Sequence, residues 1–160
     1  MLHIVKEERG DSLLVKFTGS IEENVDFNAL IGIPTLLKMD LLLKEVPRIN
    51  SVGVKAWIRY FQGIAAKGVK LRLLECSTAI VEQVNLISNF VAGGTVESMY
   101  VPFCCSTCGA ELLGLFRTAD LKKIQFKIPE LKCAKCGGTA SFDDIPEEYF
   151  GFLMRNPVEK

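Results

Sequence analysis

The sequence predicts an α/β protein in which a mixed β-sheet with packed helices is joined to a small cysteine-rich module. Two observations carry this prediction. As far as about residue 100, short apolar runs of strand length alternate with amphipathic segments, which is typical of a sheet with helices packed on it. Five of the six cysteines then fall between residues 104 and 136. We therefore expect a first domain at residues 1–102 and a second domain, which ends in a helix, at residues 103–160.

The first domain is expected to begin with a hairpin, because residues 2–7 and 12–18 are extended segments on either side of a Gly10-Asp11 turn. A helix that contains Phe27 is expected next. It should be short, because Gly and Pro follow it closely. Later elements of this domain are a strand at residues 70–74, a helix that Ser77 caps and an extended stretch at residues 96–103.

Residues 41–68 form the centre of the first domain. The apolar run Leu41–Leu43 predicts a strand that is buried on both faces, and Pro47 ends it. A wide apolar stripe at helical spacing follows before Gly68, which predicts an amphipathic helix that stops there. The stripe comprises Val54, Trp57, Ile58, Phe61, Ile64 and Ala65.

The start of this helix is a candidate site. Asn50 and Ser51 form a pair of capping residues there. Free N–H groups and the helix dipole favour an anion at such a position, so a phosphate on Ser51 would be well placed. A serine at a helix start is also an ordinary cap, worth about 1 kcal/mol. The residues alone leave both interpretations open.

The segment Asn50-Ser51-Val52-Gly53, between a buried strand and an amphipathic helix, resembles the signature of the STAS domain family, which includes bacterial anti-sigma-factor antagonists. Residues 66–74, residues 77–90 and the Gly19-Ser20-Ile21 turn resemble further family features, so the likeness covers roughly residues 1–100. The family motif has Asp and Ser where this sequence has Asn50 and Val52. The resemblance implies a regulatory protein-binding module without enzymatic activity. It also implies a partner that contacts residues 50–53 and phosphorylates Ser51, namely a kinase that is also an anti-sigma factor.

Two Cys-x-x-Cys-Gly knuckles, at residues 105–109 and 133–137, are the strongest chemical signal in the chain. Two residues between thiolates let one tight turn present both sulfurs to a single ion, with Zn–S bonds of about 2.3 Å. The glycine permits a positive φ after the second sulfur. The pattern resembles a zinc ribbon and predicts one structural zinc per chain, because four thiolates leave no open position. The predicted ligands are Cys105, Cys108, Cys133 and Cys136.

The identity of the metal and the roles of the two remaining cysteines are open to more than one interpretation. Iron is a minor alternative to zinc, because ligand type alone does not select the metal. Cys104 is a second candidate for the first ligand position, although we expect it to be a core or interface thiol, and Cys76 is expected in the core. In the tail, Asp144 is expected to cap a helix whose aromatic residues pack on the protein or form a partner or dimer contact.

The charge balance and the motifs argue against several classes of function. From Cys104 onward the chain has eight Lys/Arg and eight Asp/Glu, which lacks the basic footprint of a nucleic-acid module. A single histidine, His3, and the absence of a phosphate-binding loop argue against catalysis. No apolar run reaches the roughly 18 residues of a membrane span, and we expect a cytoplasmic bacterial protein. The alternative functions are a nucleic-acid-binding ribbon and a thiol redox protein, and a homo-oligomer is left open.

Overall fold

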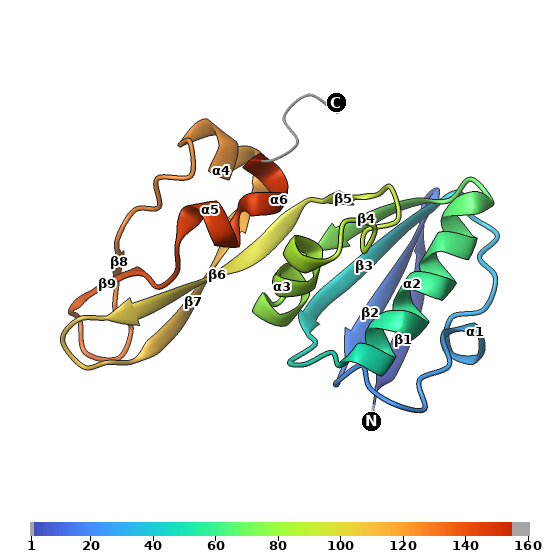
Figure 1. The fold of residues 1–160 in the computed structure, drawn as a ribbon, viewed down its shortest axis with the longest axis horizontal. Helices are drawn as coiled ribbons and strands as arrows, with labels where there is room; N and C mark the ends of the chain where they lie inside the picture. The colour runs from blue at the N-terminus through green and yellow to red at the C-terminus, as the bar shows by residue number, and fades with distance from the viewer. Residues whose placement is uncertain (1, 155–160) are drawn as a thin grey trace.

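The computed structural model describes residues 2–154 and arranges them as two sheets side by side (Figure 1). The first sheet has five strands in the order β1-β2-β3-β4-β5, with β1 antiparallel to β2 and the others parallel. The prediction of an α/β protein with a mixed sheet is therefore confirmed. The strands are β1 His3–Arg9, β2 Ser12–Thr18, β3 Lys38–Glu45, β4 Lys70–Leu74 and β5 Thr95–Val96. The helices between them are α1 Phe27–Leu30, α2 Ser51–Ala66 and α3 Thr78–Leu86.

The three helices of this domain pack on one face of the first sheet (Figure 1). Leu41 and Leu43 point toward them and are fully buried, whereas Leu42 points the opposite way and is only half-buried. The prediction that this run is buried on both faces was therefore wrong for Leu42. On the same side as Leu42, the Arg72 guanidinium donates two hydrogen bonds of 2.7 and 2.8 Å to the Asp40 carboxylate, which gives that face a polar element.

The amphipathic helix α2 supplies much of the core. Its predicted apolar stripe is confirmed in part: Val54, Trp57, Phe61 and Ile64 are buried, with Tyr60 as an additional member, whereas Ile58 and Ala65 are only half-buried. The Trp57 indole stacks on the Phe90 ring at a centroid distance of 4.8 Å, and its Nε1 donates to the Phe90 carbonyl at 2.9 Å. The ring of Trp57 is thus packed against another ring and its N–H has a hydrogen-bond partner, as a buried tryptophan requires. The helix ends at Ala66, and Gly68 follows with a φ of 90°.

The second sheet is antiparallel, with the strand order β7-β6-β9-β8. The strands are β6 Ser98–Cys105, β7 Glu111–Arg117, β8 Leu131–Lys132 and β9 Thr139–Phe142, and the helices are α4 Thr118–Lys123, α5 Pro146–Tyr149 and α6 Gly151–Met154. The extended stretch expected at residues 96–103 is divided, because β5 joins the first sheet and β6 the second. The expected tail helix is two short helices, and Asp144 does not cap the first, which starts after Ile145. Tyr149 and Phe150 are buried, which confirms that the tail packs on the protein.

Hydrogen bonds join the two halves where β6 begins. The Cys76 N–H donates to the Ser98 carbonyl at 3.0 Å, and the Tyr100 N–H donates to the Cys76 carbonyl at 2.9 Å. Asn85 of α3 then reaches the tail, because its Nδ2 donates to the Tyr149 carbonyl and its Oδ1 accepts from the Phe152 N–H, both at 2.9 Å. The buried apolar side chains of both halves form one continuous cluster. Within residues 2–154, no helix has the length and apolar character needed to span a membrane.

Candidate metal centre

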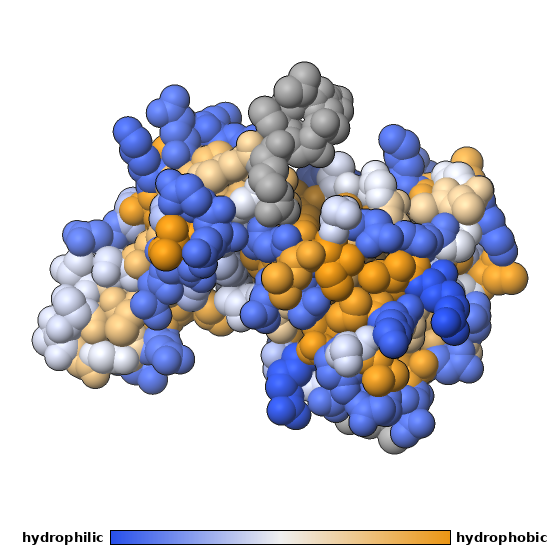
Figure 2. All heavy atoms as spheres, viewed as in Figure 1, coloured by the Kyte–Doolittle hydropathy of each residue, from blue (hydrophilic) through white to orange (hydrophobic). Residues whose placement is uncertain are grey.

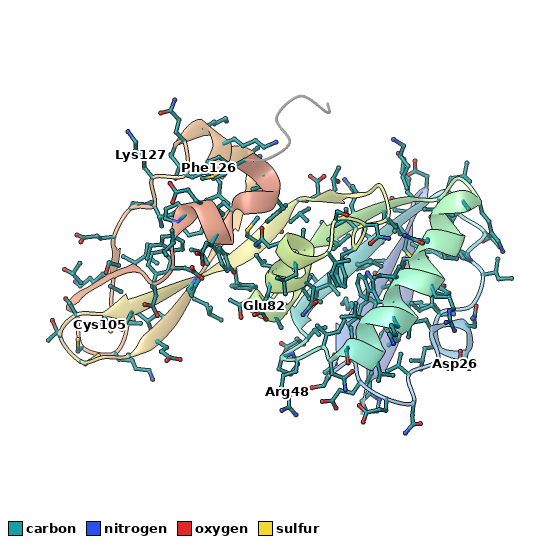
Figure 3. All side chains as sticks on the ribbon, viewed as in Figure 1. Asp26, Arg48, Glu82, Cys105, Phe126 and Lys127 are labelled. Carbon is teal, nitrogen blue, oxygen red and sulfur yellow. The ribbon has the colours of Figure 1, made fainter. Side chains whose placement is uncertain are left out.

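Two turns at one end of the second sheet bring the four predicted ligands together. The first turn connects β6 to β7 and carries Cys105 and Cys108, and the second connects β8 to β9 and carries Cys133 and Cys136. Figure 3 shows Cys105 at the end of this sheet that lies away from the first sheet. The β6–β7 and β8–β9 strand pairs therefore hold the two turns in place, although the turns are distant in sequence.

Both knuckles have the same backbone geometry. The N–H of Gly109 donates to the Cys105 carbonyl at 3.0 Å, and the N–H of Gly137 donates to the Cys133 carbonyl at 2.9 Å. The two glycines have φ values of 74° and 79°, a region that residues with a Cβ rarely adopt. The glycine after each Cys-x-x-Cys pair is therefore required by the turn, as its position in the sequence predicts.

The four sulfurs are spaced for one ion. All four Sγ atoms lie within 4.8 Å of one another. The Cys105 and Cys136 sulfurs are 3.5 Å apart, and those of Cys108 and Cys133 are 3.8 Å apart. Tetrahedral ligands at about 2.3 Å from a metal lie about 3.8 Å from one another. The four cysteines could therefore hold a metal ion with only small movements of their side chains.

Backbone N–H groups point at the sulfurs and favour their ionised form. The Thr107 N–H lies 3.4 Å from the Cys105 Sγ, the Lys135 N–H lies 3.4 Å from the Cys133 Sγ, and the Gly138 N–H lies 3.3 Å from the Cys136 Sγ. Each N–H places partial positive charge beside a sulfur, and hydrogen bonding to the charged form lowers a pKa. These N–H groups therefore stabilise negative charge on the sulfur atoms of the cluster.

The thiols of the cluster also affect one another. Hydrogen bonds from the backbone N–H groups of Cys108 and Thr107 lower the pKa of Cys105 to about 6. The pKa of Cys133 is also lowered, first by the Cys136 N–H. The pKa of Cys136 is raised to about 12, because the effect of the Cys105 and Cys108 thiols exceeds the lowering by the Gly138 N–H. Four thiolates this close together therefore need a cation to ionise together.

Gly138 is a site residue that sequence reasoning missed. A Cβ at this position would lie 2.6 Å from the Thr107 Oγ1 and 3.2 Å from the Cys136 Sγ. Only glycine lets the second turn approach the first this closely while its N–H bonds the sulfur. The signal was present in the sequence as a second glycine directly after the knuckle at residues 133–137.

The six cysteines differ in burial, both inside and outside the cluster. Cys105 and Cys133 are buried, whereas Cys108 and Cys136 are exposed, so one side of the site faces solvent. Cys104 is the neighbour of Cys105 on β6, where successive side chains point to opposite faces, and it does not join the cluster. Cys76 is fully buried, and that burial raises the pKa of its thiol. Both were expected outside the ligand set.

The second candidate site, at the start of α2, differs from the prediction in one respect. The Asn50 side chain alone caps the helix, because its Oδ1 accepts from the Gly53 N–H at 2.8 Å. Ser51 is the first helical residue and is exposed, and Val52 beside it is 49% exposed. Gly53 packs on the Ile21 backbone so closely that a Cβ would lie 2.2 Å from the Ile21 carbonyl oxygen. The segment at residues 50–53 is thus anchored on one side and open on the other.

Comparisons with known proteins assign no function to the chain, so any functional inference rests on the two candidate sites. A scan against protein-family models found no match, and a search of curated proteins found no match either.

Proposed function

We propose that this protein is a non-enzymatic regulatory module that binds another protein through the start of α2, with a structural zinc in its second domain. The proposal takes its class of partner from the resemblance of residues 50–53 to the STAS signature, in which that partner is a kinase that is also an anti-sigma factor. We place this activity in the bacterial cytoplasm. Its main support is the exposure of Ser51 at a helix start whose cap is supplied by Asn50.

The surface near Ser51 suits a protein contact. Val52, the neighbour of Ser51 in α2, is 49% exposed, and Figure 2 shows hydrophobic residues over the part of the first domain where α2 and α3 lie. The Glu23 carboxylate, which accepts a hydrogen bond from the Asn50 side chain, places a negative charge beside the site. A phosphate on Ser51 would add about two more negative charges. A partner with an apolar or acidic contact surface would then be repelled.

Zinc is the metal that best fits the cysteine cluster. Soft thiolates select zinc, copper(I) or iron, and four thiolates in a tetrahedral set are typical of structural zinc. When bound, the ion would link the two turns and neutralise the thiolates that the backbone N–H groups favour. It would stabilise the fold of the second domain and would take no part in a reaction.

The experiment compares wild type, Ser51→Ala and Ser51→Asp as tagged baits in a pull-down from the source cells, with quantification by mass spectrometry. We expect one protein to be captured by wild type and Ser51→Ala but at least about tenfold less by Ser51→Asp, as a charge mismatch in a contact costs several kcal/mol. Both variants should unfold within about 0.5 kcal/mol of wild type, since the cap is on Asn50. Ser88→Asp is the control, because Ser88 is exposed but lies outside residues 50–53. Equal capture by all four baits would refute the switch.

A further inference from the structure

A groove with a volume of about 1050 Å³ lies between the two halves of the molecule. Its walls come from α3, from β6 and β7, and from the segment at residues 143–149, so it exists only because the two halves are docked. Figure 1 shows α3 facing the second sheet across this region, and the surface is indented there (Figure 2). None of residues 50–53 lines the groove, which is therefore a different surface from the start of α2.

The charge of the groove has one sign. Six carboxylates line it, and none of its lining residues is Lys, Arg or His. All six are exposed, and none forms an ion pair with a basic residue in the described part of the chain. A cleft lined by one sign of charge focuses its field and attracts ligands of the opposite sign. The six are Glu82, Glu111, Asp143, Asp144, Glu147 and Glu148.

Two exposed leucines stand in the same groove. Leu86 of α3 is 71% exposed and Leu113 of β7 is 60% exposed, and they belong to different walls. Leu115, 49% exposed, lies on the same side of β7 as Leu113, because alternate residues of a strand share a face. Large apolar side chains exposed at the walls of a concave surface are the contacts that a partner's apolar anchors would cover.

The carboxylates do not form a metal site. Among residues 2–154, the only group of acidic, histidine or cysteine side chains close enough to share an ion is the four-cysteine cluster. The six carboxylates come from α3, β7 and residues 143–148, so they are spread along the groove. Figure 3 shows Glu82 on α3. A ligand that matches them must carry several separated positive charges, and nucleic acid would be repelled.

We propose that this groove binds a basic amphipathic segment of a partner protein. The apolar side chains of the segment would cover Leu86 and Leu113, and its Lys and Arg side chains would lie over the carboxylates. Charge complementarity of this kind speeds association and selects the partner, and the leucines supply the apolar contact that charge alone does not. The inference does not depend on phosphorylation of Ser51 or on the class of partner that we propose for it.

The test uses the full-length protein and two fluorescent peptides, measured by anisotropy. One peptide carries Lys on one helical face and Leu on the other, and the second has Glu in place of each Lys. We expect saturable 1:1 binding of the Lys peptide, with at least about tenfold weaker binding of the Glu peptide. Binding should also weaken by about tenfold between 0.1 and 1 M salt, as screening shortens the range of the charges.

Matched variants distinguish binding in the groove from non-specific binding elsewhere on the surface. Leu86→Ser and Glu82→Lys should each weaken binding of the Lys peptide by about tenfold. The controls are Leu37→Ser, at a site of similar exposure (66%) outside the groove, and Glu130→Lys, at an exposed acid that does not line it. Both should bind as wild type does. If the controls lose as much affinity as the groove variants, or if the Glu peptide binds equally well, the proposal is overturned. Ser51→Asp should leave peptide binding unchanged, so the two proposals can fail separately.

Discussion

Replacing Gly53 with alanine should destabilise the protein, whereas the same replacement at Gly63 in the same helix should stabilise it. A Cβ at Gly53 would lie 2.2 Å from the carbonyl oxygen of Ile21 and 2.7 Å from its carbonyl carbon. Both are backbone atoms, so the clash cannot be relieved by a change of rotamer. A Cβ at Gly63 would meet no atom within 4 Å. The two positions therefore separate the effect of the contact from the general preference of helices for alanine.

The magnitude follows from three contributions. Alanine in place of glycine within a helix gains roughly 0.5–1 kcal/mol, and this is the whole effect expected at Gly63. At Gly53, forcing α2 away from Ile21 costs about 1–3 kcal/mol by analogy with overpacked cores. The shift also weakens the 3.1 Å hydrogen bond from the Asn50 N–H to the Ile21 carbonyl, at about 0.5–1.5 kcal/mol. The net loss expected for Gly53→Ala is therefore about 0.5–4 kcal/mol.

Urea unfolding followed by tryptophan fluorescence measures both variants directly. Trp57 is the single tryptophan of the chain, and it is buried against Phe90, so its emission should report unfolding of the first domain. The midpoints should move in opposite directions while the slope of free energy against urea stays constant. If Gly53→Ala were as stable as Gly63→Ala, α2 would not approach Ile21 as described. The placement of Ser51 at that helix start would then lose its basis.

The features that sequence predicted best are those with local causes. The spacing within each knuckle and the glycine after it are set by one turn, so the four cysteines that could hold a metal ion were predictable from residues 105–109 and 133–137 alone. The cap of α2 was predicted less well, because capping depends on backbone angles that the residue types alone do not determine. Asn50 has the extended φ and ψ of −99° and 179° and takes the cap, which leaves Ser51 inside the helix.

The features that sequence could not predict depend on pairs of distant residues. Leu42 belongs to a run that is apolar throughout, yet its burial depends on which face of the sheet the helices cover. The contact of Asn85 with the tail spans 64 and 67 residues of sequence. The six carboxylates of the groove likewise lie between residues 82 and 148 and show no shared pattern along the chain. The last two features arise from docking of the two halves, whereas the partial burial of Leu42 follows from helix packing on one face of the first sheet.

Two further predictions address the second domain and its docking. Cys133→Ser should lower the zinc content of freshly purified, reduced protein from one equivalent to less than about half, because the site needs all four thiolates. Cys104→Ser should leave it unchanged, and equal zinc in both variants would contradict the ligand assignment. Asn85→Ala removes the two 2.9 Å bonds to the Tyr149 carbonyl and the Phe152 N–H and should cost about 1–2 kcal/mol. Since both bonds lie between α3 and the tail, amide hydrogen exchange should rise at Phe152 and its neighbours while the centre of the first sheet keeps its protection. Equal loss of protection in both places would mean that the two halves unfold as one unit.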